Sequence, residues 1–214
     1  MSWDSVINQK RVKEALRRAV ARDRVAHAYL FHGPLGTGKR AVGLEFAKLL
    51  ECERGEEEAC DRCLACTKVR KLVHPDVQVE LPHPKGADED RVARRLKLLA
   101  TEPYAETDFT RRPSLEDPGE SSNRQALYPV DRVRELRRML SYTPSEGRYK
   151  VTIMADVDRM RPEAANAFLK LLEEPAPRTV LILTTHRPDQ LLPTVSSRCQ
   201  QLRFTPLSPG ELQQ

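Results

Sequence analysis

The sequence predicts an α/β fold in which helices cover both faces of a parallel sheet. Short apolar runs of strand length alternate along the chain with amphipathic segments of helical period, the order that a parallel sheet requires. A glycine-rich loop, from Gly33 to Lys39, separates one of these runs from the helical segment after it. The 214 residues are enough for one large domain.

Composition and charge exclude several classes of protein. With 39% hydrophobic and 31% charged residues, the chain is neither collagen-like nor wholly disordered. No apolar run approaches the ~18 residues of a membrane span, and the start lacks the pattern of a secretion signal. A net charge of +5 favours an anionic partner without forming a dense basic field. We expect a cytoplasmic protein that does not enter a membrane.

The first half of the chain alternates helix, strand, helix and strand. Apolar residues recur at helical spacing over 9–23, and the run Ala28–His32 has the length of a buried strand. The glycine-rich loop and a second helix follow it. Residues 77–81 are predicted to form the next strand.

The second half continues this order with two helices and three strands. One helix is predicted over Val130–Leu140, and another over 163–173, where Pro175 stops it. The strands are predicted over residues 151–154, 179–184 and 201–204.

Two segments fall outside the alternation. Residues 83–126 contain four prolines, several charge clusters and little periodicity. We interpret them as an insertion, mobile in part, with a helix over 90–99; a solvated insertion is favoured over a dedicated binding arm. Ser208 and the residues after it have the cap, proline and acid that begin a helix. We therefore expect one domain over residues 1–207 and the truncated start of a second over 208–214.

The glycine-rich loop has the residue types that bind phosphate groups. Its glycines let backbone N–H groups turn toward an anion, the helix N-terminus adds partial positive charge, and the lysine reaches the outer phosphates. The candidate nucleotide-binding residues are Gly33, Gly36, Thr37, Gly38 and Lys39.

Two contacts that hold Mg²⁺ in P-loop ATPases are missing from the sequence. The residue after Lys39 should be Ser or Thr, but it is Arg40, which cannot ligate a cation. The strand over 151–154 should end in a metal-supporting Asp, and Ala155 stands there; a shifted register would put Asp156 in that position instead. We predict no hydrolysis by this chain, which leaves ATP or ADP binding without turnover open.

Four of the five cysteines lie close together in the sequence. Cys52, Cys60, Cys63 and Cys66 are separated by seven, two and two residues. Four thiolates at such spacing suit tetrahedral Zn²⁺ in a structural role, because no position is left for a substrate. Free or redox-active cysteines and an iron–sulfur cluster are the alternatives. Cys199 is interpreted separately, as a small buried residue.

A single arginine near the end of the chain is the candidate catalytic residue. Arg198 follows the predicted strand 179–184, between Ser197 and Cys199. A P-loop protein without a metal site of its own can donate such an arginine to the phosphate of a neighbouring subunit. An ordinary surface arginine is the alternative.

Together these residues resemble the AAA+ subunits of bacterial clamp loaders, and most closely the δ′ family of the DNA polymerase III clamp loader. The resemblance covers nearly the whole chain outside residues 83–126. It rests on residues 27–31, the phosphate loop, the four cysteines, residues 146–151, residues 164–175, which match most specifically, and Ser197-Arg198-Cys199.

The resemblance implies a P-loop AAA+ fold and a place in a machine that loads the sliding clamp onto primed DNA. It implies a non-hydrolysing stator with Arg198 acting in trans at a motor subunit's ATP site, and Thr185 at the sensor position. It also implies other clamp-loader subunits as partners, DNA reached through the assembled complex, and a lid and a collar domain after residue 207. An active motor subunit and a DNA-binding zinc protein are alternatives; Ala155 weighs against the first, and 5% aromatic content against the second.

Overall fold

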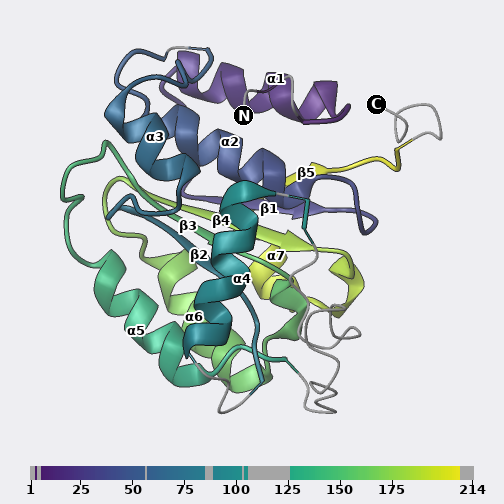
Figure 1. The fold of residues 1–214 in the computed structure, drawn as a ribbon. Helices are drawn as coiled ribbons and strands as arrows, with labels where there is room; N and C mark the ends of the chain where they lie inside the picture. The colour runs from purple at the N-terminus through teal and green to yellow at the C-terminus, as the bar shows by residue number, and fades with distance from the viewer. Residues whose placement is uncertain are drawn as a thin grey trace.

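A five-stranded parallel sheet lies at the centre of the molecule (Figure 1). The computed structural model describes Trp3 and residues 6–55, 57–84, 89–102, 104–105 and 126–207. The order across the sheet is β2-β3-β4-β1-β5, which confirms the predicted α/β fold. The strands are β1 (Ala28–His32), β2 (Val77–Glu80), β3 (Lys150–Met154), β4 (Thr179–Thr185) and β5 (Gln200–Arg203).

Helices cover both faces of the sheet. Figure 1 shows α1, α2 and α3 on one side of it and α5 and α6 on the other. The helices are α1 (Lys10–Ala21), α2 (Lys39–Glu51), α3 (Leu64–Arg70), α4 (Glu89–Thr101), α5 (Val130–Leu140), α6 (Pro162–Glu173) and α7 (Pro193–Ser196), with 3-10 turns η2 (Val157–Arg159) and η3 (Pro188–Gln190). Among the described residues, none of the helices combines the length and the hydrophobicity that a membrane crossing needs.

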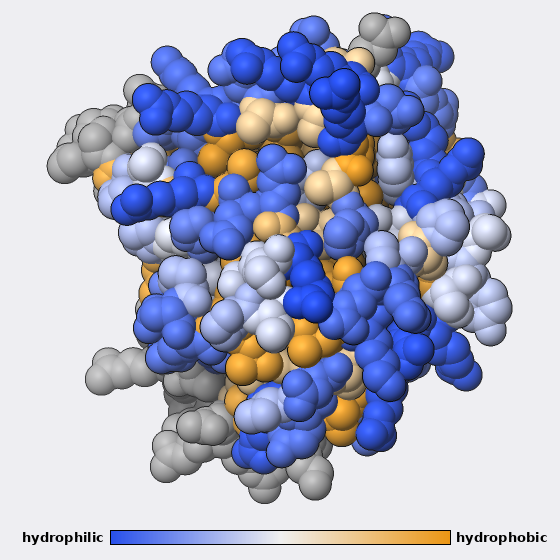
Figure 2. All heavy atoms as spheres, turned by 180° about the vertical axis from the view of Figure 1, so that it is seen from behind, coloured by the Kyte–Doolittle hydropathy of each residue, from blue (hydrophilic) through white to orange (hydrophobic). Residues whose placement is uncertain are grey.

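Each face of the sheet packs against its own apolar core, because successive residues of a strand point to opposite faces. Tyr29 and Phe31 of β1 point toward α2, and the ring of Tyr29 meets that of Phe46 edge to face at 5.1 Å between centroids. Leu30, between them, joins Phe168 of α6 in the core of the other face. Seen from behind, the surface is mostly hydrophilic, with apolar atoms between charged side chains (Figure 2).

All the helices and strands predicted within the described residues are present, with bounds that differ by at most two residues. The two shortest helices, α3 and α7, were not predicted, because seven and four residues are too few to show a helical period. The side chain of Cys63 caps α3 by accepting a hydrogen bond from the N–H of Cys66. A cysteine in this role is not among the residues that signal a helix start in a sequence.

The insertion over 83–126 is described only in part. Its predicted helix is α4, which lies in front of the sheet in Figure 1. Leu99 of α4 is fully buried and packs against Leu81 and Ala155, so this helix is anchored to the ends of β2 and β3. Most of the loop expected after it lies outside the described residues, as does the helix start expected at 208–214.

Candidate functional site

The phosphate loop joins β1 to α2 in the predicted position. Gly33 has a φ of 145°, and a Cβ built there would lie 2.4 Å from the carbonyl oxygen of Phe204. Only glycine therefore lets the loop pass this close to the chain that follows β5. The five candidate residues lie close together, because all of them belong to the short loop between β1 and α2 or to the first residue of α2.

The lysine of the loop binds the loop itself. Lys39 is buried, and its Nζ donates hydrogen bonds to the carbonyl oxygens of Gly33 at 2.8 Å and Pro34 at 2.5 Å. Burial lowers the pKa of Lys39 to about 8, although the carboxylate of Asp156 acts in the opposite direction. The amino group that would reach a phosphate is thus engaged by backbone oxygens.

Directly after β3, the position where a metal-binding Asp is expected is occupied by Ala155, which is buried in the core. The N–H of Ala155 donates to the carbonyl oxygen of Glu80 at 3.0 Å, and its side chain packs with Leu99. Asp156 follows in a left-handed conformation (φ 49°). The predicted sensor residue, Thr185, donates its hydroxyl to Oδ1 of Asp158 at 2.5 Å. Ligand atoms of Asp156, Asp158 and His186 all lie within 4.8 Å of one another.

Arg198 lies at the amino end of the parallel strands, whereas the phosphate loop lies at their carboxyl end. It comes just before β5, whose Gln200 pairs with Tyr29 near the start of β1, whereas Gly33 follows the end of β1. Gly33 comes four residues after Tyr29, so about 13 Å of strand separates the phosphate loop from the start of β5. The guanidinium of Arg198 binds Oε1 of Glu173 at 2.8 Å and the carbonyl oxygen of Thr194 at 3.0 Å. Arg198 therefore does not reach the loop of its own chain.

The four clustered cysteines converge on one point. Their sulfur atoms all lie within 4.8 Å of one another, and none forms a disulfide. Tetrahedral zinc with bonds of about 2.3 Å places sulfur atoms about 3.8 Å apart, so small movements would satisfy it. The backbone N–H of Arg62, helped by that of Cys63, lowers the pKa of Cys60 to about 6. Cys199 lies apart and half-buried, donating its thiol to the carbonyl of Val195.

Comparisons with known proteins identify the family. Residues 8–208 match the family model described as "DNA polymerase III, delta subunit". The chain belongs to this family. It is 31% identical over 214 residues to the DNA polymerase III subunit delta′ of Bacillus subtilis, covering all of this chain and 53% of that protein. It is 30% identical over 203 residues to the DNA polymerase III subunit tau of the same bacterium, covering 94% of this chain and 29% of the other. The chain spans about half of the length of this delta′ relative and less than a third of the length of the tau relative.

Solved structures show the same fold. A DNA polymerase III gamma subunit-related protein from Thermotoga maritima superposes with a TM-score of 0.52 at 22% identity, covering 92% of this chain and 47% of that one. The AAA domain of FIGL-1, solved in complex with ADP, superposes with a TM-score of 0.50 at 17% identity, covering 99% of this chain and 57% of that one. The predicted AAA+ fold is therefore confirmed for this member of the delta subunit family.

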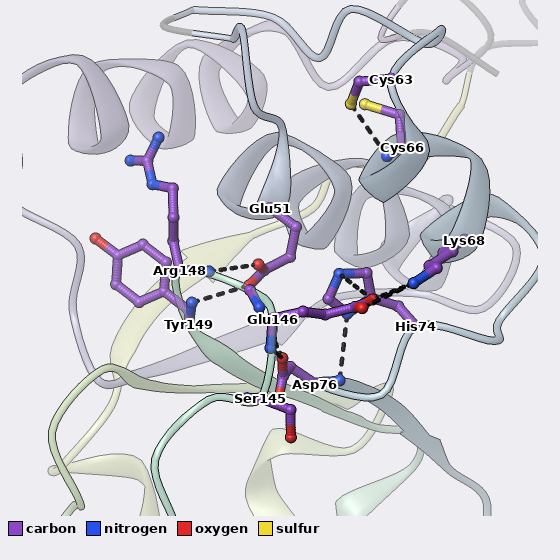
Figure 3. A network of polar contacts seen from close by, with 11 residues as sticks. Glu51, Cys63, Cys66, Lys68, His74, Asp76, Ser145, Glu146, Arg148 and Tyr149 are labelled. Carbon is purple, nitrogen blue, oxygen red and sulfur yellow. Dashed lines mark hydrogen bonds and ion pairs between the residues drawn. The ribbon is translucent and has the colours of Figure 1, made fainter.

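In this family member, two buried carboxylates hold the segment before β3, a feature that the sequence analysis missed (Figure 3). Asp76 accepts hydrogen bonds from the N–H groups of Ser145, Glu146 and Gly147 at 2.7–2.8 Å. Glu51, at the end of α2, accepts those of Arg148 and Tyr149 at 2.8 and 3.1 Å. Residues 145–149, most of which belong to a segment of the family resemblance, are thus fixed by their backbone. The one signal in the sequence that could have revealed this contact is that the largely apolar helix α2 ends in an acidic residue, Glu51.

A buried ion pair connects α2 to the cysteine cluster. Lys48 is 2% exposed, and its Nζ lies 2.8 Å from Oε2 of the equally buried Glu45. The same ammonium group pairs with Asp61, which lies between Cys60 and Cys63. This network connects the segment that carries the cysteines to the core of the domain.

Proposed function

We propose that this chain is the AAA+ part of a non-hydrolysing clamp-loader subunit that donates Arg198 to the ATP site of a neighbouring motor subunit. Membership of the delta subunit family supports a role in a DNA polymerase III clamp loader. Other clamp-loader subunits would then be its partners in the cytoplasm, and primed DNA would be reached through the assembled complex.

The observation that carries the proposal is the separation of Arg198 from the loop of its own chain. The guanidinium lies at the amino end of the parallel strands, and the phosphate loop of the same chain lies at their carboxyl end. Arg198 would therefore bind a nucleotide phosphate only in another subunit. Arg198 is 36% exposed, and its two contacts leave part of its fork of N–H donors available. Charge on a phosphoryl group in transfer is what such a group stabilises.

The absence of hydrolysis is supported by the two positions where metal contacts are expected. Arg40 adds positive charge beside Lys39, and Ala155 contributes no side-chain oxygen at the end of β3. Without a metal to neutralise the developing charge, phosphoryl transfer loses a main source of catalysis. The group formed by Asp156, Asp158 and His186 lies nearby, and ATP turnover by the protein alone would show that it supports a motor instead.

We also propose that Cys52, Cys60, Cys63 and Cys66 hold Zn²⁺ in a structural role. Convergence of the four sulfur atoms on one point favours a shared metal ion. A four-thiolate site would supply a rigid cross-link and leave no open position. The boundary after residue 207, with a lid domain beginning at 208, is likewise a proposal.

ATP hydrolysis tests the functional proposal directly. The purified intact protein, with Mg²⁺ and primed DNA, should show no turnover above a blank. In the assembled complex, Arg198→Ala should slow ATP hydrolysis by about 10³-fold at the one ATP site that Arg198 serves. The total rate of ATP hydrolysis should then fall by the fraction which that site contributes. Arg138→Ala, on the exposed surface of α5, is the matched control. Unchanged turnover with Arg198→Ala would contradict the proposal.

A further inference from the structure

The chain segment that follows α4 lies directly on the phosphate loop. A Cβ built on Gly38 would lie 3.2 Å from a ring carbon and from the hydroxyl oxygen of Tyr104, so the tyrosine side chain sits against the residue that caps α2. The hydroxyl of Tyr104 accepts a hydrogen bond from the N–H of Ile7 at 2.9 Å. The next residue, Ala105, is buried, and its carbonyl oxygen accepts a hydrogen bond from Nη2 of Arg40 at 2.7 Å.

Arg40 has a structural partner that a serine or threonine at this position could not reach. Its guanidinium extends from the first turn of α2 to the carbonyl of Ala105, 65 residues later in the chain. The substitution that removes a metal contact therefore also supplies the anchor for this segment. A hydrogen bond from a charged donor is stronger than one between neutral groups, so this contact holds the segment in place.

The second missing metal contact is also matched to the insertion. Ala155 packs in an apolar cluster with Leu81 and with the fully buried Leu99 of α4. An aspartate at 155 would place a carboxylate against these leucines, which is unfavourable unless α4 moved away. The two positions where a P-loop ATPase holds its metal are thus in contact with α4, through Leu99, and with Ala105.

The two cationic side chains of the loop and the glycine before α2 are engaged in the same arrangement. Nζ of Lys39 bonds to Gly33 and Pro34, Arg40 bonds to Ala105, and Tyr104 covers Gly38. A nucleotide needs access to the backbone of this loop and to its lysine. The residues present do not fit a bound ATP or ADP while Tyr104 and Ala105 are in place.

We infer that Tyr104 and Ala105 close the phosphate loop from within the chain, with Arg40 as their anchor, and that this closure excludes nucleotide. The role of these two residues is to occupy the phosphate-binding position of the loop. The inference deepens the non-hydrolysing part of the proposed function and does not depend on Arg198.

Equilibrium binding of ADP to the intact protein in EDTA tests this inference, since no metal contact is expected. Wild-type protein should bind ADP at least about tenfold more weakly than the double variant Tyr104→Ala/Arg40→Ser, because only the open fraction binds. Tyr142→Ala, which removes another exposed tyrosine, is the matched control and should behave as wild type. Adding Lys39→Ala to the double variant should abolish the gained binding, which locates it at the loop.

Amide hydrogen exchange gives a second readout that does not need the double variant. The N–H groups of residues 36–40 should exchange slowly in the wild type and faster in Tyr104→Ala, whereas Tyr104→Phe, which keeps the ring on Gly38, should change exchange less. Wild-type binding as tight as that of the double variant would overturn the inference. So would a folded double variant without gained binding, or exchange that Tyr104→Ala leaves unchanged. ADP binding by wild type without ATP turnover would overturn the closure alone, whereas turnover would overturn the proposed function as well.

Discussion

Glu51 and Gly147 lie so close that no side chain fits between them. A Cβ on Gly147 would fall 2.2 Å from Oε2 of Glu51, which is well inside van der Waals contact. This closeness lets the carboxylate of Glu51 accept the N–H groups of the two residues after Gly147. The last turn of α2, which begins at the phosphate loop, is thereby connected to the residues that lead into β3.

Replacement of this glycine should destabilise the domain. We expect Gly147→Ala to lower the free energy of unfolding by about 2 kcal/mol or more, because the added methyl group must displace Glu51 from its N–H donors. Denaturant unfolding measures the effect. In a Glu51→Ala background, where the obstacle is gone, the same substitution should cost much less, and equal costs in the two backgrounds would contradict this account.

The ionisation of Glu51 should make stability depend on pH. Burial raises the pKa of Glu51 to about 7, above its value in an unfolded chain. The folded state therefore binds more protons between about pH 4.5 and 7, so the contribution of this group is full below pH 4.5 and is lost as the pH rises through 7. The difference corresponds to about 3 kcal/mol.

Comparison with Glu51→Gln isolates that contribution. The stability advantage of the wild type over this variant should shrink as the pH rises from 5 to 8, and a constant difference would contradict the prediction. Asp76 acts in the opposite direction at lower pH. Burial would raise its pKa, but the N–H groups of Glu146, Ser145 and Gly147 outweigh burial and lower it, so its contribution is lost only in stronger acid.

Metal analysis should find one zinc ion per chain. Cys63→Ser should lose the metal and lower the unfolding temperature, because Cys63 also caps α3 through its sulfur. Cys199→Ser is the matched control, since Cys199 lies apart from the cluster, and it should keep the zinc. Elemental analysis by mass spectrometry gives the content directly, and wild-type protein purified without metal or with iron would contradict the assignment.

Glu173 should position Arg198 for its proposed role. Its carboxylate holds the guanidinium at 2.8 Å, and both side chains are partly exposed, so the pair adds little to stability. We expect Glu173→Gln to lower the turnover of the assembled complex by about threefold to tenfold through loss of orientation, with KM for ATP unchanged. Glu174→Gln, the exposed neighbour, should have no effect. Loss of folding stability without loss of turnover would assign Glu173 a structural role only.

The positions of the strands, the phosphate loop and the cysteine spacing were predictable because each depends on residues that are near in sequence. Alternation of apolar runs shows which residues of β1 and β4 are buried, and a loop between strand and helix shows where phosphate donors would lie. The same locality explains what was missed. The seven residues of α3 are too few for a helical period, and its cap is a cysteine.

What the sequence by itself determined is the α/β fold, the family resemblance and the identity of the candidate residues. Tertiary structure alone decided what those residues touch. The contacts of Arg40 with Ala105, of Ala155 with Leu99, and of Glu51 with residues 148–149 join positions 56 to 98 residues apart, and no periodicity or spacing carries such information. A chain packed to the density of a crystal places distant segments in contact only through the shape of the whole fold, so the partner of a side chain is settled when the elements assemble.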